Sequence, residues 1–81
     1  MQDYTQHAMT VANEVVWELN RDDVAVQVNE LQELGCCAVT VICAIPGGVH
    51  ADNFLVDSRP RHTSEWIRNR ILLIVYNLTE R

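Results

Sequence analysis

Residues 36–45 constrain the fold more than any other part of the sequence. They are nearly all apolar and include β-branched residues, which favour an extended strand: Val39, Thr40, Val41, Ile42 and Ile45. Alternate residues of a strand point to opposite faces, and here both sets are apolar apart from Thr40. The segment therefore predicts a strand that is covered on both sides or that lies in an interface.

The following residues predict that this strand turns back on itself. Pro46 and Gly47 stand at the centre of a four-residue turn, where a type II turn favours proline followed by glycine. A return strand within residues 49–56 would complete a β-hairpin. Polar residues weaken its first half, and an apolar run anchors its end: Phe54, Leu55 and Val56.

Two segments carry apolar residues at helical spacing. Residues 5–20 contain a stripe formed by Ala8, Val11, Ala12, Val15, Val16 and Leu19. Residues 64–79, which follow a possible capping residue at Thr63 or Ser64, contain a second stripe formed by Ile67, Ile71, Ile74 and Leu78. We expect a helix in each segment, with Trp17 and Trp66 packed in the core. A strand over residues 71–76 is the alternative for part of the last segment.

Residues 22–34 fit two structures. Asp22 and Asp23 suit a helix N-terminus, and Gly35 suits the left-handed position that follows a helix. Residues 24–28, however, also alternate as a strand does. We favour a helix here, either separate from the first helix or continuous with it over residues 5–34.

The predicted fold is a small α+β domain that spans residues 1–81 in the order helix, helix, β-hairpin, helix. We expect the hairpin to pack against the helices. The last helix is apolar on several faces, because Leu72, Leu73, Val75 and Tyr76 add to its stripe. A helix of this kind is buried on more than one side. Since 81 residues leave little protein to cover it, we expect a homodimer or a larger homo-oligomer.

Charge is distributed unevenly along the chain. The net charge is −5, and every cationic side chain is an arginine. Residues 1–58 carry nine acidic side chains and one arginine, whereas residues 59–81 carry five arginines and two glutamates. An acidic chain disfavours binding to duplex nucleic acid. The basic part is expected to pair with the acidic part, with another protomer or with a partner.

The cysteines and the apolar segments indicate a compartment. Cys36, Cys37 and Cys43 lie within an apolar run, which favours reduced, buried thiols over a disulfide framework. The first residues are polar and acidic, unlike a signal peptide. The longest uninterrupted apolar stretch, residues 71–76, is too short to cross a membrane. We expect a cytoplasmic protein that does not associate with membranes.

The loop before the last helix is the strongest candidate for a ligand site. A helix N-terminus offers backbone N–H groups and a partial positive charge, and this loop, held by Pro60, adds arginines. The combination suits a phosphate or a carboxylate. Arg70 is expected to point away from it. The alternative is a solvated loop whose arginines pair with the acidic part of the chain. The predicted anion-binding residues are Arg59, Arg61, His62, Thr63, Ser64 and Arg68.

The acidic residues suggest a second kind of surface. If residues 22–34 are helical, carboxylates of two helices form one face: Glu14, Glu18, Asp22, Asp23, Glu30 and Glu33. Such a face can replace phosphates against the basic residues of a partner protein. An ordinary solvated face is the alternative.

Catalytic and metal-binding patterns are weak. Cys43, His50 and Asp52 are the one set that the hairpin can bring together for nucleophilic catalysis. Pairing of Ile45 with Val49 would place Cys43 and His50 on opposite faces, which argues against this set. The cysteines also lack the spacing of a zinc site. We expect no catalytic site, no metal site and no cofactor.

Two functional hypotheses remain. The first is a non-enzymatic interaction protein, a small acidic inhibitor or regulator that binds a protein partner through its acidic face. The second is an oligomeric module that sequesters a nucleotide or another small phosphorylated ligand at the arginine-rich loop.

Overall fold

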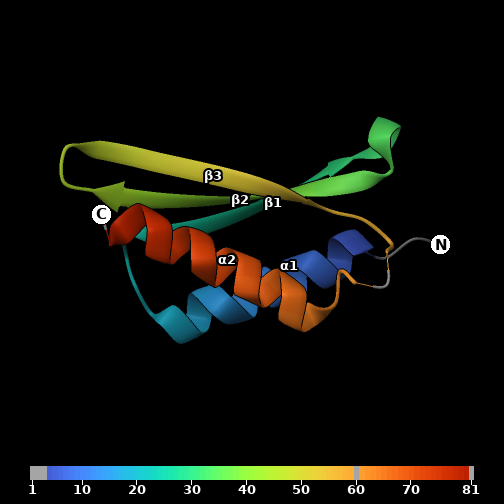
Figure 1. Ribbon diagram of the computed structural model, residues 1–81, viewed down its shortest axis with the longest axis horizontal. Helices are drawn as coiled ribbons and strands as arrows, with labels where there is room; N and C mark the ends of the chain where they lie inside the picture. Colours follow the sequence, from blue (N-terminus) through green and yellow to red (C-terminus); the bar gives the residue numbers. More distant parts are fainter. Residues whose placement is uncertain (1–3, 60, 81) are drawn as a thin grey trace.

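A computed structural model describes residues 4–59 and 61–80. Pro60, and the Asp3 and Arg81 side chains counted in the charge distribution, lie outside the described residues. The elements are helix α1 (Tyr4–Leu19), strand β1 (Val24–Leu31), the 3-10 turn η1 (Gln32–Leu34), strands β2 (Cys36–Ile45) and β3 (Gly48–Val56), and helix α2 (Ser64–Thr79). The strands form an antiparallel sheet in the order β1-β2-β3, and both helices lie on one face of it (Figure 1). The predicted α+β class is confirmed.

The predicted helix over residues 22–34 is wrong, and so is a continuous helix over residues 5–34. The segment forms β1 and η1 instead, so three strands separate two helices. Helical spacing and strand alternation coexist in this segment, and the partner strand decides between them. Pairing with β2 supplies hydrogen-bond partners to the inner edge of β1. It also brings three valines onto the apolar surface of β2, in the pairs Val24↔Cys43, Val26↔Val41 and Val28↔Val39.

Left-handed residues end the elements on either side of β1. Asn20, with a φ of 51°, follows α1, and its amide donates to the Val16 carbonyl at 3.1 Å. Asparagine tolerates this conformation better than most residues, so α1 ends without glycine or proline. Gly35, with a φ of 66°, occupies the predicted left-handed position, but it follows η1 rather than a long helix.

The predicted hairpin is confirmed, with a different register. Gly47 has a φ of 97°, the positive value that the turn requires. Ile45 pairs with Gly48 rather than with Val49, because β3 begins one residue earlier than expected. This shift makes Cys43 and His50 cross-strand partners. The prediction that they lie on opposite faces is therefore wrong, since paired residues share a face.

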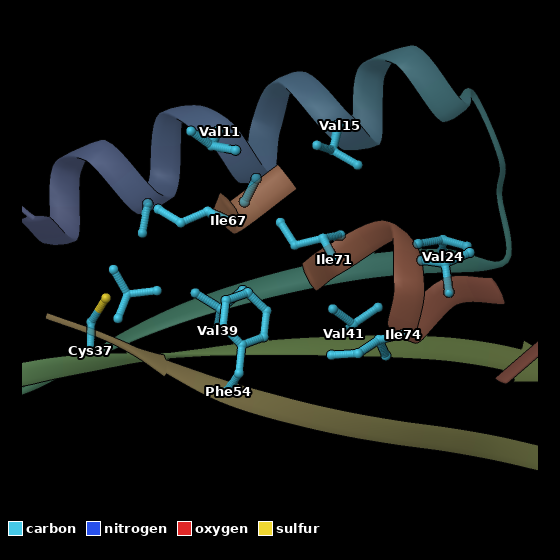
Figure 2. Packing of buried hydrophobic residues seen from close by; sticks show 14 of the residues in the cluster. Val11, Val15, Val24, Cys37, Val39, Val41, Phe54, Ile67, Ile71 and Ile74 are labelled. Carbon is cyan, nitrogen blue, oxygen red and sulfur yellow. The ribbon is translucent and has the colours of Figure 1, made fainter. Parts of the chain in front are cut away.

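The core lies between the helices and one face of the sheet. The expected stripes of both helices are buried there, including Val11 and Val15 of α1 and Ile67 and Ile71 of α2. Figure 2 shows these side chains in the space between the two helices and the sheet. Truncation of a fully buried isoleucine to alanine typically costs about 2–5 kcal/mol. The sheet side of the core consists of Cys37, Val39, Val41, Cys43, Phe54 and Val56.

The tryptophans and the thiols lie in contrasting environments. Trp66 is half-buried and packs against the core as expected. Trp17 is 82% exposed, so the prediction of core packing is wrong for it. It stands two residues after buried Val15, about 200° around the helix.

All three cysteines are free and buried, in line with their apolar setting. Burial raises the pKa of Cys37 and of Cys43.

The described chain covers only one face of the sheet with helices (Figure 1). We call the other face the open face. It is formed by the odd-numbered residues 25–31 of β1, the even-numbered residues 36–44 of β2 and the odd-numbered residues 49–55 of β3. Apart from Cys36, these residues are half-buried or exposed. Within the described residues, β2 is therefore covered on one side, although both of its faces are apolar.

Candidate functional site

Residues 57–59 and 61–63, which connect β3 to α2, form a pocket with the end of β3 and the first half of α2. The pocket has a volume of about 300 Å³, and we call it the arginine pocket. Three of its eight lining residues are arginines and one is an aspartate, so it is locally cationic in a chain of net charge −5. The lining residues are Phe54, Leu55, Asp57, Arg59, Arg61, His62, Trp66 and Arg70.

His62 holds this connection against α2. Its side chain is buried, and its Nδ1 accepts a hydrogen bond of 3.0 Å from the Asp57 amide. The carboxylate oxygen Oδ1 of Asp57 lies 3.1 Å from the same nitrogen. The imidazole also stacks on the Trp66 ring, with centroids 4.1 Å apart and planes 14° apart. His62, predicted as an anion ligand, therefore has its Nδ1 and one ring face occupied within the fold.

Aromatic rings position Arg70 at the pocket. Its guanidinium carbon lies 5.6 Å from the Phe54 ring centroid and 5.9 Å from that of Trp66, within the range of cation–π attraction. The two rings meet edge to face, with centroids 5.7 Å apart. Phe54 is buried and belongs to the hydrophobic core. Arg70 thus stands on an aromatic support.

The three pocket arginines differ in what they contact. Arg59 pairs with Asp57, whose carboxylate accepts both the Arg59 side chain and the Arg59 amide at 2.9 Å. Among the described residues, no carboxylate lies within ion-pair distance of Arg61 or Arg70. Both side chains are exposed. Two cationic groups at the pocket therefore lack an acidic partner in the described part of the chain.

The other residues predicted for the anion site lie elsewhere. Thr63 is the N-cap of α2, and its side chain accepts a hydrogen bond of 3.2 Å from the Trp66 amide. The Ser64 hydroxyl is 3.3 Å from Nε2 of His7 on α1. Arg68 pairs with Glu18, also on α1. The structure thus brings Arg59, Arg61 and His62 together and leaves these three residues out of the pocket lining.

Arg70 is the pocket arginine that the sequence argument missed. The argument correctly placed Arg68 and Arg70 on different sides of the helix, but it assigned the wrong one of the two to the site. Arg68 turns to α1, whereas Arg70 lines the pocket. The spacing of Trp66 and Arg70 was an available signal, because residues four apart lie on the same side of a helix.

The acidic residues do not form one helical face, because the second helix is absent. Glu14 and Glu18 lie on α1, and Asp22 and Asp23 lie just after it, whereas Glu30 and Glu33 lie at the far end of β1 and in η1. The length of β1 separates Asp23 from Glu30 by about 20 Å. The premise of the predicted face is therefore wrong.

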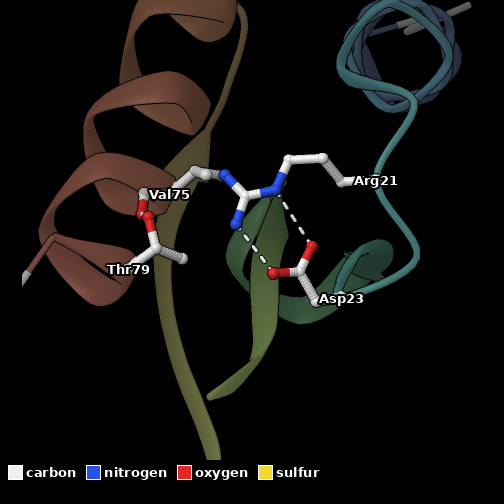
Figure 3. A network of polar contacts seen from close by, with 4 residues as sticks. All are labelled: Arg21, Asp23, Val75 and Thr79. Carbon is white, nitrogen blue, oxygen red and sulfur yellow. Dashed lines mark hydrogen bonds and ion pairs between the residues drawn. The ribbon is translucent and has the colours of Figure 1, made fainter. Parts of the chain in front are cut away.

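Part of the acidic group is neutralised. Arg21 donates two hydrogen bonds to the Asp23 carboxylate, at 3.0 and 2.7 Å, as Figure 3 shows. These bonds lower the pKa of Asp23. Glu18 pairs with Arg68. Glu14 remains on the outer side of α1 beside Trp17, where the two residues line a shallow depression together with Asn13 and Glu18.

The set Cys43, His50 and Asp52 does not have the environment of a nucleophilic site. Cys43 and His50 share a face, but Cys43 is fully buried, whereas His50 and Asp52 are exposed. Burial raises the pKa of Cys43, whereas an activated cysteine needs a lowered pKa. Among the described residues, no three His, Cys, Asp or Glu side chains gather as a metal site requires.

Comparison of the chain with known protein families, with curated protein sequences and with solved structures finds no match. Within residues 4–59 and 61–80, no helix has the length and apolar character needed to cross a membrane.

Proposed function

We propose that this protein is a non-enzymatic module that binds a small phosphorylated ligand in the arginine pocket. The observation that carries the proposal is the pair Arg61 and Arg70, which line one pocket without a carboxylate partner among the described residues. Other carboxylates are common on this chain, yet none in residues 4–59 and 61–80 forms an ion pair with these two arginines. We place the protein in the cytoplasm, because buried free thiols suit a reducing compartment.

The chemistry of the pocket favours an anionic head group over an aromatic base. Trp66 has His62 stacked on its ring and Arg70 near it, so the ring supports these residues rather than offering a free face to a ligand. Arginine forks form paired, charge-assisted hydrogen bonds with phosphate oxygens. A volume of about 300 Å³ lies at the lower limit of small-molecule sites. We therefore infer a phosphoryl group on a small molecule as the recognised feature.

Calorimetric titration tests this proposal. The panel contains inorganic phosphate, pyrophosphate and mononucleotides, with citrate as a polycarboxylate comparison. We expect Arg61→Gln and Arg70→Gln each to weaken phosphate-ligand binding by about 10-fold or more, because each removes a charge-assisted contact. Arg68→Gln is the matched control, because it removes an arginine of the same helix that pairs with Glu18 outside the pocket.

Two outcomes would contradict the proposal. One is the absence of binding by any panel member at millimolar concentration. The other is an equal loss of affinity in Arg68→Gln, which would indicate a general charge effect rather than a site. Tighter binding of citrate than of pyrophosphate would reassign the pocket to carboxylates.

A second candidate function rests on the outer surface of α1. Trp17 is 82% exposed and lies beside Glu14, and exposed tryptophans are enriched at the centres of protein interfaces. We propose that, if the protein acts as an acidic inhibitor or regulator, a basic partner docks here. Glu14→Arg and Trp17→Ala should each abolish capture of that partner, whereas Gln6→Arg, an exposed change elsewhere on α1, should not. Equal capture by all variants would exclude this surface.

A further inference from the structure

The ionisable side chains of the sheet lie on one side of it. Apart from cysteines, the three strands contain Glu30, His50 and Asp52. Their cross-strand partners are Cys37, Cys43 and Val41, all buried beneath the helices. Because paired residues share a face, all three ionisable groups lie on the helix side of the sheet. The open face carries no ionisable group apart from the Cys36 thiol, which is buried.

This distribution is the reverse of what a solvated sheet face requires. An antiparallel sheet with one face in water normally places polar and charged residues on that face. Here the open face has apolar residues at its ends, among them Leu55, 51% exposed, and Val49, 68% exposed. Its middle row consists of uncharged polar side chains, Gln27, Thr40 and Asn53, which pair across the three strands.

We propose that the open face docks against the open face of a second copy of this chain, forming a two-sheet sandwich. A charged partner would find no complementary charge on this face. Two copies of net charge −5 repel each other, and contact through the uncharged face keeps the charged helical layers on the outside. Amide and hydroxyl groups both donate and accept hydrogen bonds, so the middle row is complementary to itself across a twofold axis.

The size of the face predicts a weak dimer. Three strands spaced about 4.8 Å apart, with about eight residues each rising about 3.3 Å, give roughly 400 Å² of flat area. Side-chain relief increases this area toward the roughly 600 Å² per partner that marks the lower limit of specific interfaces. We therefore expect dissociation in the micromolar range. Sheets in such a sandwich pack about 10 Å apart.

Sedimentation velocity over 1–300 µM protein tests the dimer. The unmodified chain should shift from monomer to dimer across this range. Gln27→Arg and Asn53→Arg each place a charge on the open face at an exposed position, and each should weaken the dimer by about 30-fold or more. Asn69→Arg adds the same charge at an exposed position of α2 and should leave the dimer unchanged. Circular dichroism and the melting temperature verify that each variant folds.

Three results would overturn the proposal. The first is a chain that stays monomeric at 300 µM. The second is a dimer that Gln27→Arg and Asn53→Arg leave intact. The third is a dimer that Asn69→Arg weakens as much as they do, which would place the interface on the helices. If one open-face variant fails to fold, the other, on the opposite outer strand, gives the same test. Leu55 belongs to both the open face and the pocket lining, but the middle row Gln27, Thr40 and Asn53 lies outside the pocket, so Arg70→Gln should leave the dimer intact.

Discussion

The two connections that join the helices to the sheet use the same residue types to different ends. Residues 20–23, between α1 and β1, place Arg21 against Asp23 in a closed pair. Residues 57–63, between β3 and α2, place Arg59 against Asp57, but Arg61 and Arg70 remain beside them without a carboxylate partner among the described residues. In the first connection the arginine is paired with a neighbouring carboxylate. In the second, two arginines without such a partner line a pocket.

The difference lies in the supporting residues rather than in the charges. The first connection is held by its backbone, with Asn20 in a left-handed conformation and the Asp23 carbonyl accepting from the Ala44 amide at 2.8 Å. The second has a backbone hydrogen bond too, from the His62 amide to the Arg59 carbonyl at 3.0 Å, and adds side-chain contacts: buried His62, stacked on Trp66, and the Thr63 cap. A loop fixed by buried aromatic groups can present arginines that are not themselves needed for its structure.

Removing the buried histidine should have the largest effect. His62→Ala leaves the Asp57 amide without its acceptor and opens a gap beside Trp66, so we expect a loss of about 2–3 kcal/mol in the free energy of unfolding. Urea denaturation measures it. His50→Ala, at an exposed histidine on β3, is the control and should change stability by less than about 0.5 kcal/mol. Equal effects of the two substitutions would mean that His62 does not hold the connection.

Removing the helix cap should have the next largest effect. Thr63→Ala takes away the acceptor of the Trp66 amide and should cost about 1 kcal/mol. Thr63→Ser keeps a hydroxyl oxygen and should retain most of the stability. The same denaturation experiment measures both. If serine and alanine behave alike at this position, the hydrogen bond does not stabilise the start of α2.

Substitution of Asn20, in the first connection, should have a smaller effect on stability. Asn20→Ala places a residue with low tolerance for positive φ at 51° and should cost about 0.5–1 kcal/mol. Asn20→Gly should be neutral or slightly stabilising, because glycine adopts this conformation without steric penalty. Thermal unfolding of the two variants compares them directly. A glycine variant less stable than the alanine variant would show that conformation is not the determinant here.

The smallest effect is expected for the exposed pair in the first connection, and it depends on pH. The pKa of Asp23 is lowered by its hydrogen bonds from Arg21, so the pair stabilises the fold above the ordinary pKa of a carboxyl, about 3.9. That contribution is lost as the pH falls through the folded-state pKa. The stability difference between the unmodified chain and Asp23→Asn should be constant from pH 5 to 7 and shrink below about pH 4.

Urea unfolding at pH 7, 5 and 3 measures this difference. Asp22→Asn, at the exposed neighbouring aspartate, is the control and should show no stability difference at any of the three. A stability difference for Asp23→Asn that grows at pH 3 would contradict the prediction that the Arg21–Asp23 pair loses its stabilising effect at low pH.

Much of the fold could be predicted from local patterns. The helical stripe around Val11 and Val15, the stripe around Ile67 and Ile71, and the turn at Gly47 each indicated the correct element. The helix predicted over residues 22–34 was wrong because the valines there fit both helical and strand periodicity. Only the pairing with β2 distinguishes the two structures. The predicted hairpin register was wrong by one residue. Pairing of Ile45 with Val49 would leave a three-residue loop and the observed pairing with Gly48 leaves a two-residue loop, and both loops contain Pro46 and Gly47.

The candidate site was predicted in part for a similar reason. The loop sequence identified Arg59 and Arg61, because cationic residues before a helix are visible in a linear chain. It also suggested Arg68, but this side chain forms an ion pair with Glu18 on α1. Arg70 was missed because its position at the pocket depends on a contact with Phe54, which lies on β3. Contacts between distant segments carry no signal in local spacing.

The sequence by itself determined where two helices and a hairpin form, since hydrophobic periodicity and turn chemistry act over a few residues. The tertiary structure alone decided that residues 24–31 are a strand, which arginines pair and which remain at a pocket, and that one face of the sheet stays uncovered by helices within the described residues. The physical reason is that pairing across a sheet and between helices depends on residues dozens of positions apart. Their proximity is set only when the chain packs into one core.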